Sequence, residues 1–528
     1  MWRLVCAISI AMAATLCFGL LVAIPAVAAT PNIPVISVQG YPAPGNTLTV
    51  SGYRFRVGET VSVKYDAAFV ATAKVFQRIT IQQPPSGGDS GSFSATFTVP
   101  IATTTGAHTV SAVGQTSGDT AQTTITVKAN WSQFGFTSAN TRYNSYETAI
   151  NPSNVANLAL DWSLHNSNLS NSANNSATVS DGTLYIAGIG TLFALDATTG
   201  ATKWTASDYQ IFGRTPAVSH GVVVTSGYGV EGWDTATGRL LWMANEAPIF
   251  TYGVTVADGL VFVAKDDTLY AFNLTGCGSI SCNPEWTYVE TGGSILDLPA
   301  VANGVVYVAD STTLGWSVAA IDEHKGTLSW KDPIATGFGT STPVIDNGDL
   351  IVNTNSSSQG GMLYGFSASG CGAATCAPLW TAPDASQDSD TPAVANGVVY
   401  VGTPDWHLEA FNEAGCVAPP CSPLWSASLD GKVAAAPAVA DGIVYVSVDN
   451  DTAARGTVYA FPAAGCGSST CTPLWKWTTY NDAFEDAPIV VNGTVYIPTY
   501  DGTLYAFHLP GASVRITPGH ITGGKASR

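Results

Sequence analysis

Charged side chains and methionine are scarce in this chain. Of its 528 residues only 11% are Asp, Glu, Lys or Arg, and only four are Met. The charges that are present are mostly acidic and give a formal net charge of −18 at pH 7. A nucleic-acid partner is therefore not expected, because phosphate binding needs clustered Lys and Arg. The simplest role of the acidic excess is to keep an exported, charge-poor protein soluble.

The common motifs of catalysis are missing as well. There is no Gly-x-Ser-x-Gly elbow and no His-Glu-x-x-His pair, so the signatures of serine hydrolases and zinc proteases are absent. The seven His are scattered along the chain. Paired carboxylates for glycoside hydrolysis remain open, because a fold can bring distant Asp and Glu together. The motifs alone predict no reaction.

Long apolar runs occur only at the N-terminus. After Arg3 the sequence is apolar as far as Val22 and then reaches Ala26-Val27-Ala28, a small-x-small cleavage pattern. Residues 1–28 are therefore predicted to be a secretory signal peptide, with an uncleaved membrane anchor as the alternative. The mature protein is expected to be secreted or held at the cell surface.

Most of the remaining chain is a repeat. An Asp-Gly, Asn-Gly or His-Gly pair between two short apolar runs recurs eight times, at intervals of 38 to 51 residues. Such a pair is a strong signal for a tight hairpin, and the interval is that of a four-stranded propeller blade. The first residues of the eight pairs are Asp181, His220, Asp258, Asn303, Asn347, Asn396, Asp441 and Asn492.

Tryptophan marks the last strand of each repeat except the eighth. Seven repeats end in a strand with Trp204, Trp242, Trp286, Trp330, Trp380, Trp425 or Trp475, and the eighth stops after its third strand. The missing strand is predicted in residues 158–164, around Trp162, ahead of the first repeat. The sequence thus predicts an eight-bladed propeller over residues 158–509, closed by this early strand so that no sheet edge stays unpaired.

Residues 31–128 form a separate unit. Short runs with alternating polarity are divided by Gly- and Pro-rich turns and show no helical pattern. About seven strands in about 100 residues predict a β-sandwich. The phrases at 45–52, 55–61 and 91–100 resemble bacterial immunoglobulin-like modules, which implies a spacer or adhesive unit. Residues 129–157 are predicted to be a linker, and residues 510–528 a disordered tail.

The linker and the first repeats resemble a known family. Trp131-Ser-Gln-Phe-Gly and Thr141-Arg142-Tyr143, followed by Leu192-Phe-Ala-Leu-Asp196, are similar to the opening and the blade signature of pyrroloquinoline-quinone-type (PQQ-like) propellers. The resemblance covers roughly 130–509 and includes quinone-dependent dehydrogenases as well as relatives without a cofactor. It implies the fold rather than the function, because the repeat encodes blade packing.

The dehydrogenases of this family have features that can be sought here. The resemblance implies an adjacent Cys-Cys disulfide, a Trp that stacks on the quinone, and Ca²⁺ beside a catalytic Asp. This chain has no adjacent cysteines, and no catalytic residue can be matched. Trp233, Trp316 and Trp406 lie outside the fourth-strand positions and are weak candidates for stacking on a planar ligand, although packing explains them more simply.

The eight cysteines beyond the signal peptide fall into four Cys-x4-Cys pairs. Each pair lies between the third and fourth strand of a repeat. Export favours oxidation, and four pairs on four blades cannot easily converge on one metal ion. The pairs are predicted to form four local disulfides, each worth about 2 kcal/mol in the chain-entropy model: Cys277–Cys282, Cys371–Cys376, Cys416–Cys421 and Cys466–Cys471.

The longer loops of the propeller are expected on one face, around the mouth of its channel, and they are rich in acids, among them Asp297 and Asp310. Asp388, Asp390, Asp449 and Asp451 are the best candidates for holding Ca²⁺, which prefers hard oxygen ligands. The competing interpretation is that Asp simply dominates turns.

These features predict an exported, all-β, monomeric protein with two domains. Its predicted function is that of a non-enzymatic scaffold that binds a protein, glycan or small ligand on the loop-rich face of the propeller. No cofactor is expected under this interpretation. The alternative is a PQQ- and Ca²⁺-dependent oxidoreductase with a divergent site.

Overall fold

The computed structural model consists almost wholly of β-strands. It describes residues 33–77, 90–169, 176–245, 253–295, 297–312, 315–334, 339–355, 361–373, 375–384, 391–403, 405–417, 420–450, 455–467, 470–479, 484 and 486–511. The only helical elements in these ranges are the 3-10 turns η1 (Val155–Asn157) and η2 (Ser167–Leu169), and neither has the length to cross a membrane. The predicted signal peptide and most of the predicted tail lie outside the described residues.

The N-terminal unit consists of two four-stranded antiparallel sheets that share one core. Leu48, Phe55, Val63, Phe93 and Val110 are buried in it, on strands whose side chains alternate between core and solvent. One sheet contains β1 (Val35–Gln39), β2 (Thr47–Arg56), β6 (Ser90–Thr98) and β5 (Phe76–Gln77); the other contains β4 (Ala68–Lys74), β3 (Thr60–Tyr65), β7 (Gly106–Gly114) and β8 (Thr120–Val127). We call this unit the sandwich.

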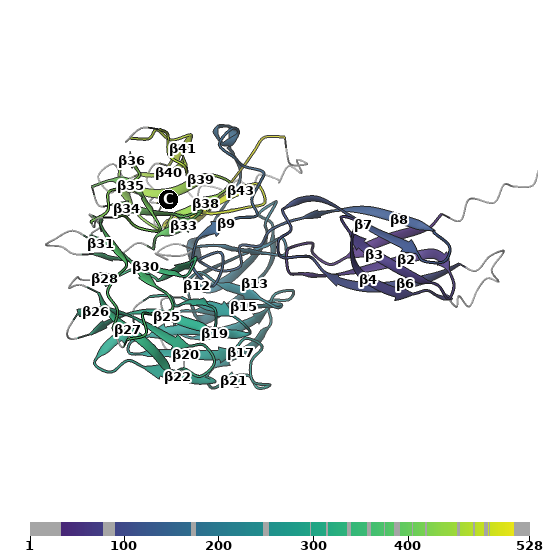
Figure 1. Cartoon of the computed structure of the whole chain (residues 1–528), viewed down its shortest axis with the longest axis horizontal. Helices are drawn as coiled ribbons and strands as arrows, with labels where there is room; N and C mark the ends of the chain where they lie inside the picture. The colour runs from purple at the N-terminus through teal and green to yellow at the C-terminus, as the bar shows by residue number, and fades with distance from the viewer. Residues whose placement is uncertain are drawn as a thin grey trace, which may run out of the picture.

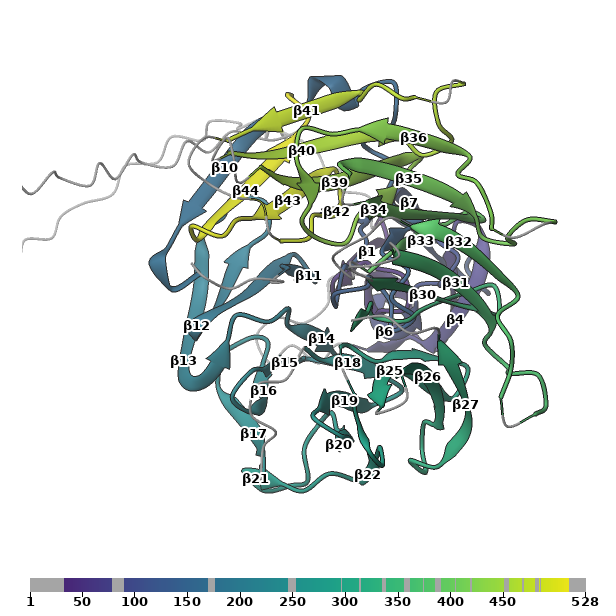
Figure 2. The same cartoon turned by 90° about the vertical axis from the view of Figure 1, so that its left-hand side faces the viewer.

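Eight further sheets follow and stand around a common centre, as in a β-propeller (Figure 2). The first sheet contains β11 (Thr178–Ser180), β12 (Thr183–Asp196) and β13 (Thr202–Phe212), and the second contains β14 (Ala217–Ser219), β15 (Val222–Ser226), β16 (Val230–Asp234) and β17 (Leu240–Ala244), with β21 (Ser281–Cys282) added in parallel. The third sheet contains β18 (Thr255–Ala257), β19 (Leu260–Lys265), β20 (Thr268–Asn273) and β22 (Trp286–Val289). In the fourth sheet, β23 (Gly293–Ile295) and β24 (Ala300–Ala302) both pair with β25 (Val305–Thr312), and β26 (Gly315–Asp322) and β27 (Leu328–Ile334) follow.

The remaining four sheets repeat this order. In the fifth sheet, β28 (Gly339–Thr340) and β29 (Val344–Asp346) both pair with β30 (Asp349–Asn355), and β31 (Gly361–Ser367) and β32 (Trp380–Asp384) follow; the sixth sheet contains β33 (Ala393–Ala395), β34 (Val398–Thr403), β35 (His407–Asn412) and β36 (Trp425–Ser428). In the seventh sheet, β37 (Lys432–Val433) and β38 (Ala438–Ala440) both pair with β39 (Ile443–Asn450), β40 (Arg455–Pro462) and β41 (Trp475–Thr478) follow, and β9 (Tyr143–Asn144) lies beside β38. The eighth sheet contains β42 (Ile489–Val491), β43 (Thr494–Pro498), β44 (Thr503–His508) and β10 (Ala159–His165).

The predicted turn chemistry explains the first hairpin of every sheet. All eight residues at the first turn position have positive φ, from 39° at Asp441 to 55° at Asn492. The glycines that follow them have positive φ too, for example 79° at Gly304. A two-residue turn of this kind matches the twist of the strands it joins. We call the face that carries these first turns the hairpin face, and the opposite face, with the links between sheets, the loop-rich face.

The tryptophan of each fourth strand joins its sheet to the next one. Trp286 donates from Nε1 to the carbonyl oxygen of Glu323 at 3.0 Å, and its ring lies against Gly326 so closely that a Cβ there would be 2.4 Å from it. The same contact between tryptophan and glycine recurs in the pairs Trp162–Gly200, Trp204–Gly238, Trp242–Gly276, Trp330–Gly370, Trp380–Gly415 and Trp425–Gly465.

The predicted pairing of the early strand with the last repeat is confirmed. β10 pairs antiparallel with β44 and supplies the fourth strand of the eighth sheet. Trp162 on β10 therefore packs against Gly200 of the first sheet, in the same way as the other tryptophans pack against a glycine of the next sheet. The first and eighth sheets also share one core, which includes Val179, Leu184 and Ile489.

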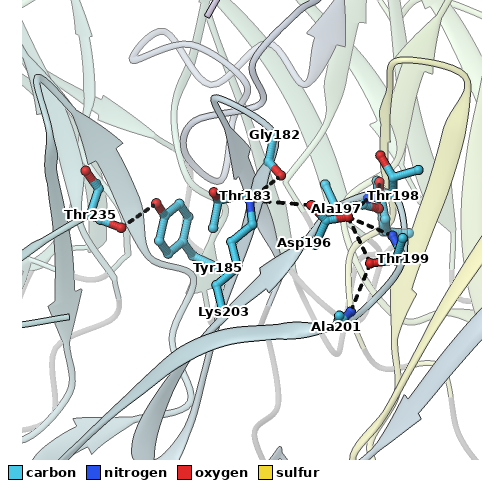
Figure 3. Close-up of polar contacts among 11 residues, drawn as sticks. Gly182, Thr183, Tyr185, Asp196, Ala197, Thr198, Thr199, Ala201, Lys203 and Thr235 are labelled. Atoms are coloured by element: carbon cyan, nitrogen blue, oxygen red, sulfur yellow. Dashed lines mark hydrogen bonds and ion pairs between the residues drawn. The ribbon is translucent and has the colours of Figure 1, made fainter. Parts of the chain in front are cut away.

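The loops between third and fourth strands are held in two ways. In the first sheet, Asp196 accepts hydrogen bonds from the N–H and the hydroxyl of Thr199 (Figure 3). Burial alone would raise the pKa of Asp196, but these bonds outweigh it and hold the pKa below its usual value. In four other sheets the loop contains one of the predicted disulfides, and all four are formed: Cys277–Cys282, Cys371–Cys376, Cys416–Cys421 and Cys466–Cys471.

Residues 131–144 do more than link the two parts of the chain. This stretch, which we call the hub segment, hydrogen-bonds the middle residue of the first strand in every sheet. In six sheets the strand N–H donates to a hub carbonyl: Val179 to Trp131, Val218 to Ser132, Val301 to Ser138, Ile345 to Ala139, Val394 to Thr141 and Val439 to Arg142. In the other two, the side-chain amides of Gln133 and Asn144 bond to Val256 and Val490.

Arg142 fixes the hub segment inside the ring of sheets. Its guanidinium is fully buried and donates to the carbonyl oxygens of Phe134, Pro437 and Pro488 at 2.5–2.7 Å. It also lies over the rings of Trp131 and Phe134. Burial lowers the pKa of Arg142 to about 9, which still leaves it charged at neutral pH.

The sandwich contacts the hairpin face and the chain that follows the hub segment. Asn46 Nδ2 donates to Asp181 Oδ1 at 2.9 Å, and the Tyr146 hydroxyl donates to the carbonyl oxygen of Ile101 at 3.0 Å. The sandwich projects from this side of the sheets (Figure 1). The loop-rich face points the other way, towards the viewer in Figure 2, with the sandwich strands behind it.

Candidate functional site

Side chains from several sheets meet at the centre of the loop-rich face. The links that precede the first strands converge there. The Thr342 hydroxyl donates to Asp297 Oδ1 at 2.9 Å, which joins the fifth and fourth sheets. The Ser176 N–H donates to the Thr215 hydroxyl oxygen at 2.8 Å, and the Ser176 hydroxyl donates to the carbonyl oxygen of Ala487 at 2.9 Å. We call the region where these links meet the mouth.

Asp297 has the most unusual position at this mouth. Its φ is 97°, a value that is costly for a residue with a Cβ and that tends to persist at functional sites. Burial raises the pKa of Asp297, while the Thr342 hydroxyl, the Leu298 N–H and the positive charge of Arg214 act in the opposite direction. A strained carboxyl group beside an arginine and a hydroxyl is suited to holding a polar ligand.

Apolar side chains from the same links pack against the hub segment. Phe134 of the hub segment packs against Leu298, Ala435, Ala436 and Ala487, which come from the links of the fourth, seventh and eighth sheets. The Arg142 guanidinium lies over the Phe134 ring, 4.7 Å from its centroid. This apolar cluster therefore joins the hub segment to the links of three sheets.

A second polar group lies between the third and fourth sheets. Lys331 Nζ is 2.7 Å from Glu290 Oε1 and 3.2 Å from Asp310 Oδ1. The Tyr288 hydroxyl donates to Glu290 Oε2 at 2.9 Å, and Ser317 donates to Asp310. Burial raises the pKa of Asp310, partly offset by the Ser317 hydroxyl and the charge of Lys331. The sequence placed Asp310 among loop acids, but its burial and its pairing with Lys331 depend on how two sheets stack.

The three candidate tryptophans have different surroundings. Trp233 is 4% exposed, packs in the core of the first and second sheets, and donates from Nε1 to the Thr225 hydroxyl at 3.0 Å. Trp316 is partly buried on β26 and packs against the core between the fourth and fifth sheets. Trp406 is 46% exposed in the turn between β34 and β35, with φ of 68°. Of the three, only Trp406 presents a large surface to a partner.

Of the four candidate calcium ligands, only Asp449 lies within the described residues. Asp449 is 3% exposed on β39, and its Oδ2 forms an ion pair with Lys432 Nζ at 3.9 Å. Asp388, Asp390 and Asp451 lie outside the described residues. Within the described ranges, no three His, Cys, Asp or Glu side chains are placed so that they could hold a metal ion.

Basic side chains on the loop-rich face are paired with acids. The pairs are Lys265–Asp266 at 3.1 Å, Lys331–Glu290 at 2.7 Å, Lys432–Asp449 at 3.9 Å and Arg455–Asp430 at 2.8 Å. Further acids exposed on this face include Asp267, Asp405 and Asp501. The face therefore has an acidic surplus beside the exposed aromatic rings of Trp406 and Tyr500.

A quinone site needs a stacking ring over a set of metal-binding oxygens. Trp233 is enclosed in the core, and Asp449 is paired with a lysine. Neither of these two candidates therefore fits a role in binding PQQ or Ca²⁺.

Comparisons with known proteins agree on the fold. A family described as outer membrane protein assembly factor BamB matches residues 228–370, 317–418 and 370–464. A second family, described as the β-propeller domain of glucose/ethanol/alcohol dehydrogenase, matches residues 131–273. A search of curated proteins gave no match.

Two solved structures illustrate the similarity. BamB from Moraxella catarrhalis is 15% identical with a TM-score of 0.51, over 68% of this chain and 100% of that one. A europium-containing methanol dehydrogenase is 14% identical with a TM-score of 0.56, over 72% of this chain and 98% of that one. At these identities the similarity establishes the fold alone.

Proposed function

This chain belongs to the PQQ-like β-propeller repeat families over residues 131–464, and from that premise we propose that it is an extracytoplasmic, non-enzymatic binding scaffold. In this proposal residues 1–28 direct export, an immunoglobulin-like sandwich acts as a spacer, and the eight sheets form one closed, monomeric eight-bladed propeller. The loop-rich face binds a protein partner. The acidic surplus on that face supports a partner with basic groups, and glycans and small ligands are the other classes of binder.

One observation carries the proposal more than the others. The apolar cluster of Phe134, Leu298, Ala435, Ala436 and Ala487 packs the hub segment against the links of three sheets. The loop-rich face carries the exposed Trp406 and a surplus of acids, and this face points away from the sandwich (Figure 1). A surface of this kind suits contact with a macromolecule better than it suits the enclosure of a small cofactor.

Closure of the ring is supported by two sets of contacts. The hub segment reaches one residue in each of the eight sheets. The tryptophan contacts run from each sheet to the next and return from Trp162 to the first sheet, while Trp475 of the seventh sheet donates to the carbonyl oxygen of Leu158, next to β10. Together these contacts leave no sheet without neighbours on both sides.

A titration with PQQ and Ca²⁺ tests the scaffold against the oxidoreductase. A cofactor that binds the native protein must raise its melting temperature by mass action. PQQ and Ca²⁺ are added at about 100 times the micromolar concentrations at which such cofactors bind. We expect the melting temperature not to rise, and we expect no reduction of an artificial electron acceptor with alcohols or sugars. A quinone-dependent alcohol dehydrogenase serves as the positive control. A Ca²⁺-dependent rise of several degrees, together with dye reduction, would contradict the proposal.

A further inference from the structure

A cavity of about 720 Å³ lies on the hairpin face, between the second and fourth sheets. His220 and Asp258, from the first turns of the second and third sheets, line it together with Asn273 and Thr275. His324, from the fourth sheet, completes the wall. Two imidazoles, a carboxylate and two smaller polar side chains therefore face one space that is large enough for an organic group.

The buried carboxyl group of Glu323 does not itself line this cavity, but it adjoins two residues that do, His324 in the chain and Asp258 in space. Glu323 precedes His324 and is 0% exposed, and neither of its carboxylate oxygens has a hydrogen-bond partner among the described residues. Burial raises the pKa of Glu323, and the nearby charge of Asp258 raises it further, while His324 acts in the opposite direction. A buried carboxyl group with no partner is costly, and each such group in a native protein needs an explanation.

The chain contains its own comparison in the sixth sheet. Glu413 occupies the equivalent position, since its N–H donates to the carbonyl oxygen of Gly397 at 2.9 Å just as that of Glu323 donates to Gly304 at 3.0 Å. Both side chains approach the first turn of the preceding sheet. For Glu413 that turn supplies Asn347, whose Nδ2 donates to Glu413 Oε2 at 3.3 Å. For Glu323 the turn residue is Asp258, which has no N–H in its side chain to donate.

We propose that Asp258 and Glu323 bind an ammonium or guanidinium group that enters through this cavity. The ligand cation supplies the N–H donors that Asn347 supplies in the sixth sheet, and two carboxylates neutralise its charge. An organic cation suits the site better than a metal ion, because the cavity is far larger than an ion and no three metal-binding side chains are gathered in the described residues. This site is on the face opposite the proposed partner surface and is additional to the proposed function.

The cation can come from a free polyamine or from a basic side chain of a peptide, and binding measurements separate the two. The mature protein is titrated with spermidine and with acetyl-arginine amide, while acetyl-citrulline amide serves as the uncharged isostere of the latter. We expect the cationic probes to bind and the citrulline compound to bind at least about tenfold more weakly. Tighter binding of the arginine amide identifies a peptide side chain as the source, and tighter binding of spermidine identifies a free polyamine.

Two variants locate the site. Asp258→Asn recreates the arrangement of Asn347 and Glu413, and Glu323→Gln removes one charge, so each is expected to weaken binding at least about tenfold. Asp441→Asn is the matched control, because Asp441 has the same turn position in the seventh sheet, but the residue that follows the third strand of the next sheet is Leu509 and not a glutamate. Melting curves verify that each variant is folded. Failure of both cations to bind at millimolar concentration, or equal binding by all three variants, would overturn the proposal.

Discussion

Replacing Arg142 with Ala is expected to lower the free energy of unfolding by about 3–5 kcal/mol. The guanidinium is fully buried and donates to three carbonyl oxygens, from Phe134, Pro437 and Pro488. Removing it leaves these carbonyls without donors inside the protein and opens a space beneath Phe134. Since the carbonyls belong to the hub segment and to the links of the seventh and eighth sheets, one substitution weakens three parts of the ring together.

Guanidinium chloride unfolding followed by tryptophan fluorescence measures this effect. Arg142→Lys keeps the charge but loses the planar fork of donors. We therefore expect its free energy of unfolding to lie between that of the wild type and that of the alanine variant. Arg239→Ala is the control, because Arg239 is exposed, and it should change stability by less than about 0.5 kcal/mol. A loss below about 1 kcal/mol for Arg142→Ala would show that the hub segment contributes little to the ring.

Replacing Gly326 with Ala is expected to destabilise the protein by about 2–4 kcal/mol. Two costs add up at this position. Gly326 has φ of 64°, a conformation that residues with a Cβ rarely adopt. In addition, the new Cβ would lie 2.4 Å from Cε3 of the Trp286 ring, which must then move away from the neighbouring sheet.

Gly304 separates the two costs. It has φ of 79°, and a Cβ there would meet nothing within 4 Å. Gly304→Ala should therefore cost only the backbone term, about 1 kcal/mol. The difference between the two variants, measured in the same unfolding experiment, reports the packing of Trp286 against the next sheet. Equal losses at the two glycines would contradict the view that this contact joins the sheets.

Much of the fold could be predicted because its signals are local. The Asn-Gly pair at Asn396 needs positive φ at both residues, so the hairpin is encoded in two positions. The strand that leaves this turn is β34, and β35 pairs with it antiparallel. The pairing of β10 with β44 could be predicted from the missing eighth tryptophan, and the disulfides from the spacing of the cysteines.

The role of the hub segment could not be predicted in the same way. Its contacts to the first strands are made mainly by backbone carbonyls, which leave no pattern of side chains in the sequence. Residues 129–157 were therefore expected to be a linker. The one side chain that signals a buried role is Arg142, and an isolated arginine gives no hint that three carbonyls will surround it.

The candidate site was predictable only in outline. Sequence indicated an acidic loop-rich face, and Asp297 and Asp310 were among its acids. The strain at Asp297 and the pairing of Asp310 with Lys331 arise from neighbouring sheets. Burial of Trp233 likewise depends on how the first and second sheets pack. Glu323 was missed, and only a comparison of its turn with that of Glu413 could have singled it out.

Hydrogen exchange at the first strands tests most directly whether the hub segment holds all eight sheets in one ring. The amides of Val218, Val301, Ile345, Val394 and Val439 donate to carbonyls of the hub segment. On a ring whose centre was open, they would face water. We predict that these amides exchange as slowly as those of the second strands, in native protein at neutral pH. Exchange within seconds, at the rate of an unstructured peptide, would contradict the account.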